Sequence, residues 1–130
     1  MIFVDLVAAV ALFQFSMFIV MVGRARHKYD VKAPAVVGHE MFERIYRVQM
    51  NTLESLIIFI PALYLAAKYW APVSIAAIGA VFIVGRVIYA IAYLKDPKGR
   101  SFGYVLSLVP MLTLVFAAIA GLLYAMHQAQ

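Results

Sequence analysis

The sequence contains no cysteine among its 130 residues. Disulfide bonds, thiolate metal sites and a nucleophilic cysteine of the protein itself are therefore excluded. The three histidines, His27, His39 and His127, lie far apart and form no metal-binding pair of the HExxH kind. We expect no metal site, and any thiol chemistry needs a thiol that a ligand supplies.

Charged residues are also scarce, since they make up 13% of the chain whereas apolar residues make up 66%. A soluble domain of this length cannot bury so much apolar surface, so the composition indicates an integral membrane protein. The net charge of +5 comes from Lys and Arg that gather mainly in two loops. This grouping is typical of membrane topology rather than of a nucleic-acid-binding face, so we expect no nucleic-acid partner.

Four apolar segments are each long enough to cross a bilayer as a helix. The pattern predicts one all-α integral membrane domain over residues 1–130, an up-and-down bundle of four transmembrane helices. No Lys or Arg precedes the first segment, which favours a retained span over a signal peptide. The predicted spans are residues 2–22, 41–69, 73–95 and 102–126.

Basic residues mark one side of the predicted bundle. They are concentrated in residues 23–39 and 95–100, the first and third connections. Because basic loops remain in the cytoplasm, we expect both of these loops there and both termini on the opposite side. Their exposed cations are expected to meet the headgroups of membrane lipids.

Polar side chains interrupt the second and third apolar segments at helical spacing. Residues at steps of three or four share one face of a helix. The two segments are antiparallel neighbours, so their polar faces should meet near the cytoplasmic side and form a cationic cleft. The residues on these faces are Arg44, Arg47, Asn51 and Glu54, then Arg86, Tyr89 and Tyr93, with Arg100 in the following loop.

Two interpretations of this cleft stay open. Polar residues often join neighbouring membrane helices, and Glu54 and Arg86 are natural partners for a structural ion pair. Alternatively, the same residues contact a ligand directly. Arginines outnumber Glu54, the one carboxylate at this depth, and this surplus favours an external anion. Such a cleft suits a small water-soluble anion that meets a lipophilic molecule from the bilayer.

The segment Phe42–Glu54, FERIYRVQMNTLE, resembles the signature of the MAPEG family, the membrane-associated proteins in eicosanoid and glutathione metabolism. The segment Arg86–Tyr93 followed by Arg100, and Arg26 with residues 32–34, are similar to further patterns of the family. The family includes microsomal glutathione transferases and leukotriene C4 synthase. The resemblance covers essentially the whole chain.

The resemblance implies a homotrimer of four-helix protomers, with glutathione as co-substrate bound between neighbouring subunits. It assigns Arg100 to stabilising the glutathione thiolate. Tyr93 either donates a hydrogen bond to the sulfur or is a tyrosine of the interfacial belt. The glutathione contacts that it implies on one subunit are Arg47, Asn51, Glu54, Tyr89 and Tyr93, and those from the neighbour are Arg26 and Gln49. The charge of the cleft adds Arg86 to the expected binding residues.

Ser55 stands where the leukotriene synthase branch of the family has a tyrosine. This difference favours a bacterial-type member, and with it a bacterial inner membrane. The implied function is a membrane glutathione transferase, with glutathione peroxidase as an additional activity, acting on a lipophilic electrophile or a lipid hydroperoxide. Two alternatives stay open: a non-catalytic lipid-binding protein of the same family, and a small transporter subunit.

Overall fold

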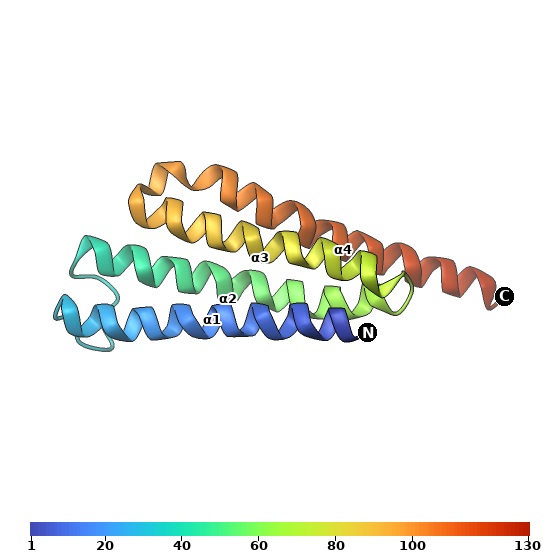
Figure 1. Ribbon diagram of the computed structural model, residues 1–130, viewed down its shortest axis with the longest axis horizontal. Coiled ribbons are helices and arrows are strands. Elements are labelled where there is room, and N and C mark those ends of the chain that lie inside the picture. The colour runs from blue at the N-terminus through green and yellow to red at the C-terminus, as the bar shows by residue number, and fades with distance from the viewer.

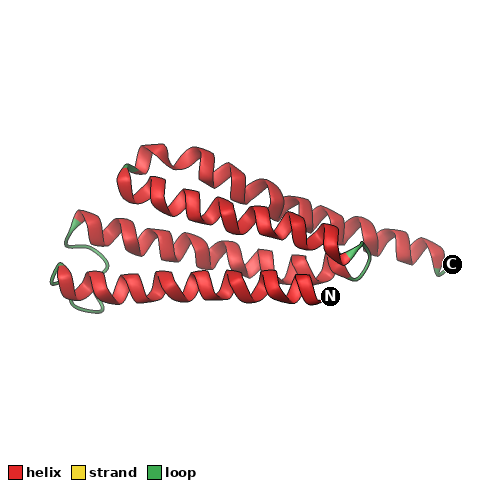
Figure 2. Ribbon diagram, viewed as in Figure 1, coloured by secondary structure: helices red, strands yellow, loops and turns green.

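The computed structural model describes residues 1–130 as four long helices and one short 3-10 helix, without strands (Figures 1 and 2). The predicted all-α class is confirmed, and all four long helices are apolar enough to cross a membrane. In chain order the elements are α1 (Ile2–Lys28), α2 (Glu40–Ala67), α3 (Pro72–Lys95), η1 (Pro97–Arg100) and α4 (Ser101–Gln128).

The largest difference from the predicted bounds is at the end of α1, which continues to Lys28 instead of ending at Val22. Its last turn carries Arg26, His27 and Lys28, and cations stabilise the negative C-terminal end of a helix. Hydropathy therefore marks where the apolar part of α1 ends, whereas the helix itself extends further on polar residues.

The helices lie side by side, and the connections alternate between the two ends of the bundle (Figure 1). Both basic connections, the α1–α2 loop and η1, lie at one end. The α2–α3 turn and both chain termini lie at the other end. The predicted up-and-down topology is therefore confirmed, and the two basic loops share one side as expected.

An apolar core joins the four helices in the half of the bundle that holds the termini. At its centre the rings of Phe59 on α2 and Phe82 on α3 stack with centroids 3.9 Å apart. Leu63, Leu114 and Val4 around them are fully buried. This core fixes the helices relative to one another and leaves the basic half of the bundle to carry polar residues.

Two glycines allow α3 and α4 to cross at close range. A Cβ at Gly103 would lie 2.4 Å from the backbone nitrogen of Tyr89, and one at Gly85 would lie 2.7 Å from that of Ser107. Small residues permit such close approach of membrane helices. The crossing places Ser107 of α4 against the α3 segment that carries Arg86.

This crossing gives the first prediction. Replacing Gly103 with Ala should lower the melting temperature of the detergent-solubilised protein, because the added methyl group meets the α3 backbone. Gly23→Ala is the matched control, since nothing lies within 4 Å of its Cβ position. Alanine favours a helix by about 1 kcal/mol over glycine, so the control should melt at or above the wild-type temperature. A Gly103→Ala protein that melts as high as the wild type would contradict this account.

Candidate active site

A cleft of about 300 Å³ opens between α2, α3 and α4 in the basic half of the bundle. Its size is at the lower end of small-molecule sites. Five of its nine lining residues are polar or charged, although the protein as a whole is apolar. The residues that line it are Asn51, Glu54, Ser55 and Ile58 from α2, Arg86 and Tyr89 from α3, Arg100 from η1, and Tyr104 and Met111 from α4.

Arg86 is the least accessible charge in this wall, with 1% of its surface exposed. Its Nε donates a hydrogen bond to Ser107 Oγ at 3.1 Å. Its guanidinium carbon lies 4.1 Å from the ring centroid of Tyr89, a cation–π geometry. Neither contact neutralises the charge, so the cleft is positive at its most buried point.

The Glu54–Arg86 ion pair, one of the two interpretations that the sequence left open, does not form. The chain's one ion pair joins Arg44 to Glu40. Glu54 is exposed on α2, whereas Arg86 is buried and directed to Ser107 on α4. Both side chains line the same cleft without neutralising each other.

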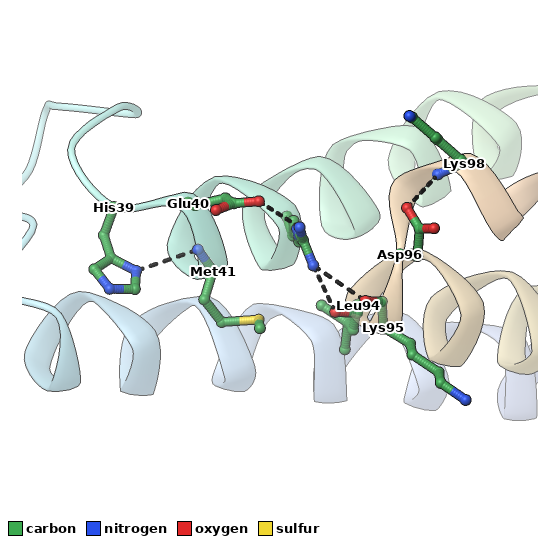
Figure 3. A network of polar contacts seen from close by, with 8 residues as sticks. His39, Glu40, Met41, Leu94, Lys95, Asp96 and Lys98 are labelled. Carbon is green, nitrogen blue, oxygen red and sulfur yellow. Dashed lines mark hydrogen bonds and ion pairs between the residues drawn. The ribbon is translucent and has the colours of Figure 1, made fainter.

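Arg44 also lies outside the cleft, so the prediction that its side chain lines the cleft is wrong. Its Nη1 donates to the backbone oxygens of Leu94 at 3.2 Å and Lys95 at 3.3 Å. Figure 3 shows this network, in which α2 binds the end of α3 next to Asp96. Carbonyl groups at a helix C-terminus lack partners within the helix, and they attract this guanidinium. Arg44 therefore anchors the C-terminal end of α3 to α2.

Aromatic rings link the two arginines of the cleft. The Asn51 amide donates a hydrogen bond to the Tyr89 hydroxyl and fixes that ring. The centroids of Tyr89 and Tyr93 are 5.5 Å apart, and the Arg100 guanidinium carbon lies 6.0 Å from the Tyr93 ring. Arg86, Tyr89, Tyr93 and Arg100 thus form a row from the buried end of the cleft to its exposed end.

The predicted site residues divide into two groups. The structure brings together Asn51, Glu54, Arg86, Tyr89 and Arg100 in the cleft, with Tyr93 packed beside them. It does not bring Arg26, Arg47 and Gln49 into the cleft of their own chain.

The residues outside the cleft have different surroundings. Arg26 holds the first loop, because its Nη1 donates to the Ala35 oxygen at 2.7 Å and its guanidinium lies 4.9 Å from the Phe42 ring. Arg47 is exposed one turn before the cleft, and Gln49 is half-buried. Their side chains remain outside the cavity of this chain.

Sequence reasoning missed the contribution of α4. Tyr104 and Met111 line the cleft, and Ser107 is the hydrogen-bond partner of Arg86. Gly103 and Ser107 are spaced as a small-xxx-small pair, which is typical of a close helix crossing. That spacing was the available signal for the α3–α4 contact.

Comparison with known proteins agrees with this geometry. The model of the MAPEG family matches residues 4–120. The chain belongs to the MAPEG family. It is 42% identical over 117 residues to human microsomal glutathione S-transferase 2, covering 86% of this chain and 80% of that protein.

Two further relatives also match most of this MAPEG chain. An uncharacterized protein of Synechocystis sp. is 41% identical over 123 residues, covering 95% of this chain and 90% of the relative. Bovine leukotriene C4 synthase is 31% identical over 99 residues, covering 76% of this chain and 66% of the synthase. These relatives support a glutathione-related family of membrane enzymes.

The contact of Arg86 with Ser107 gives a second prediction. Ser107→Ala should lower the free energy of unfolding by about 1–3 kcal/mol, the usual cost of leaving a buried polar group without its partner. Thermal unfolding in detergent measures this change. Ser16→Ala is the matched control, because both hydroxyls also donate to the carbonyl four residues earlier, but Ser16 is exposed and meets no arginine. Equal stability of the two variants would show that Arg86 does not depend on Ser107.

Proposed function

We propose that this MAPEG protein is a membrane glutathione transferase that joins glutathione to a lipophilic electrophile. The observation that carries the proposal is the charge of the cleft, where Arg86 and Arg100 face a space that contains one carboxylate, Glu54. An uncompensated pair of guanidinium groups suits an anionic co-substrate. Relatives named microsomal glutathione S-transferase support this choice of anion.

The wall of the cleft matches the functional groups of glutathione, which has two carboxylates, an ammonium group and a thiol. Arg86 and Arg100 provide positive charge for carboxylate or thiolate. Glu54 provides the matching charge for the ammonium group, and Asn51 and Tyr89 provide hydrogen bonds. Their positions on rigid helices favour a single bound orientation.

Arg100 is proposed to hold the sulfur as a thiolate. A free cysteine-type thiol has a pKa of about 8.5, so little thiolate is present at neutral pH. Lowering that pKa by about two pH units corresponds to about 2.7 kcal/mol of preference for the anion. Arg100 can supply this preference because a guanidinium keeps its proton. Tyr93, whose ring lies beside Arg100, is proposed as a second donor to the sulfur.

A homotrimer would complete the site. Arg26 and Gln49 lie outside the cleft of their own chain, so we propose that they reach the glutathione bound to a neighbouring subunit. Arg47 is exposed one turn before Asn51 on α2 and is proposed to contact the same ligand at the rim. Each site would then contain residues of two subunits.

The electrophile is proposed to enter from the lipid. Ile58 and Met111 are the cleft residues furthest along α2 and α4 from the basic end of the bundle. An apolar molecule dissolved in the bilayer can reach this part without crossing water. A lipid hydroperoxide could use the same route, and its reduction by the thiolate is the proposed peroxidase activity.

We place the basic end of the bundle and the cleft on the cytoplasmic side of a bacterial inner membrane, by the positive-inside rule.

A transporter needs a polar path through the whole bundle. Here α2 carries no charge between Glu54 and Lys68, and α3 carries none before Arg86. A site limited to half of the bundle favours an enzyme or a binding protein, and turnover separates these two.

The third prediction concerns Arg100. Arg100→Ala should lower the rate of glutathione conjugation about 100-fold, because thiolate formation loses about 2.7 kcal/mol of support. The ultraviolet absorbance of the bound thiolate should disappear as well. Lys98→Ala is the matched control, since Lys98 is an exposed cation on the same short helix. Unchanged turnover and thiolate absorbance in Arg100→Ala would remove Arg100 from this role.

The fourth prediction concerns binding itself. Millimolar glutathione should raise the melting temperature of the detergent-solubilised protein, because a ligand that binds the folded state stabilises it. Glu54→Gln should leave the melting temperature without ligand unchanged, since Glu54 is exposed and forms no ion pair. The variant should show a smaller shift with glutathione. Absence of any shift in the wild type would count against the proposed co-substrate.

A further inference from the structure

A pocket of about 690 Å³ lies at the end of the bundle opposite to the basic loops, between the α2–α3 turn and the last part of α4. We call it the terminal pocket. Figure 1 shows that α4 continues past this turn, and its last turns form one wall of the pocket. The wall includes Lys68, Tyr69 and Trp70 from the turn, and Tyr124 and Gln128 from α4. The volume of the pocket is in the range of small-molecule sites.

Two contacts hold the α2–α3 turn against α4. The Trp70 Nε1 donates a hydrogen bond to the backbone oxygen of Ala117 at 2.8 Å. Tyr69 packs on Gly121, where an added Cβ would lie 2.4 Å from the Cβ of the tyrosine. The fold itself therefore fixes Tyr69 and Trp70 in the wall of the pocket.

The terminal pocket contains the one Lys or Arg near this end of the bundle, Lys68. The first helix carries none before Arg24, α3 carries none before Arg86, and α4 carries none at all. Lys68 is exposed and forms no ion pair. Asp5, the acidic side chain at this end, accepts a hydrogen bond from Tyr64 instead. The charge of Lys68 is therefore uncompensated within the chain.

The surroundings of Lys68 change from aromatic to aliphatic toward the middle of the bundle. Tyrosine and tryptophan gather at the boundary between membrane and water, and Tyr69, Trp70 and Tyr124 line this pocket. Leu65, one turn before Lys68 and Tyr69 on the same face of α2, is 46% exposed. The pocket thus lies at the depth of lipid headgroups, and an apolar helix surface beside it is open to acyl chains.

We propose that the terminal pocket binds the headgroup of an anionic phospholipid, in the leaflet opposite to the cleft, with Lys68 as the cation for its phosphate. Tyr124 and Gln128 can donate hydrogen bonds to the same headgroup, and an acyl chain lies along the face that carries Leu65. A zwitterionic lipid brings its own cation beside the phosphate, so Lys68 favours a lipid with net negative charge. This site does not depend on the proposed transferase function.

The test uses Trp70, the one tryptophan of the chain, whose fluorescence reports on this pocket alone. Bromine atoms on acyl chains quench a tryptophan that they contact. The protein is placed in phosphatidylcholine nanodiscs that contain increasing amounts of brominated phosphatidylglycerol or, in a second series, brominated phosphatidylcholine. Phosphatidylglycerol should bind beside Trp70 about five-fold more tightly, which corresponds to about 1 kcal/mol for one cation at a lipid surface.

Three variants test the role of the charge. Lys68→Gln should abolish the preference for phosphatidylglycerol, whereas Lys68→Arg should keep it because the charge is retained. Lys98→Gln is the matched control, since this exposed lysine lies at the basic end of the bundle, about 40 Å away by the length of the helices. It removes one cation as well but should leave the quenching of Trp70 unchanged.

Two results would overturn the proposal. One is equal quenching by both brominated lipids in the wild type, or a preference that persists in Lys68→Gln. The other is displacement of the brominated lipid by millimolar glycerol 3-phosphate, which carries the phosphate without acyl chains. Such displacement would show that the pocket takes a soluble phosphate, whereas the proposal expects no effect of glycerol 3-phosphate on the quenching.

Discussion

The buried guanidinium of Arg86 is the constraint on which the cleft depends. A charge at membrane depth without a carboxylate partner costs several kcal/mol. Here the cost is reduced by the Ser107 hydroxyl and the Tyr89 ring. The Ser107 contact requires the close crossing of α3 and α4, which has no room for a side chain at Gly103, whereas Tyr89 lies one turn after Arg86 on α3 itself. The charge of the site is therefore a consequence of how these two helices pack.

The apolar core and the polar cleft lie in different halves of the bundle along its length. Its apolar core lies toward the termini, where Phe59 and Phe82 stack and Leu63 is fully buried. The polar cleft lies toward the basic loops, where Arg44 secures the end of α3 to α2. The larger apolar core can thus compensate for a polar half whose buried apolar clusters are smaller.

The sequence predicted the four helices because apolar length alone identifies a membrane span. Helical spacing also found Asn51, Glu54 and Arg86, since one face of each helix lines the cleft. The same spacing wrongly included Arg44, because the free carbonyl groups at the end of α3 are visible only in three dimensions. Ser107 was missed for a similar reason: it looks like an ordinary small residue in an apolar span until its contact with Arg86 is known.

The row from Arg86 to Arg100 explains how two like charges share one small cleft. Two tyrosine rings lie between them, with contacts of 4.1 Å, 5.5 Å and 6.0 Å along the row, and each cation meets a different ring face. Their surroundings also differ, because Arg100 is exposed near the basic loops whereas Arg86 is buried. Arg100 is therefore open to exchange with water, whereas Arg86 is held by Ser107 and Tyr89. The two cations of the cleft thus differ in solvation although one row of aromatic rings joins them.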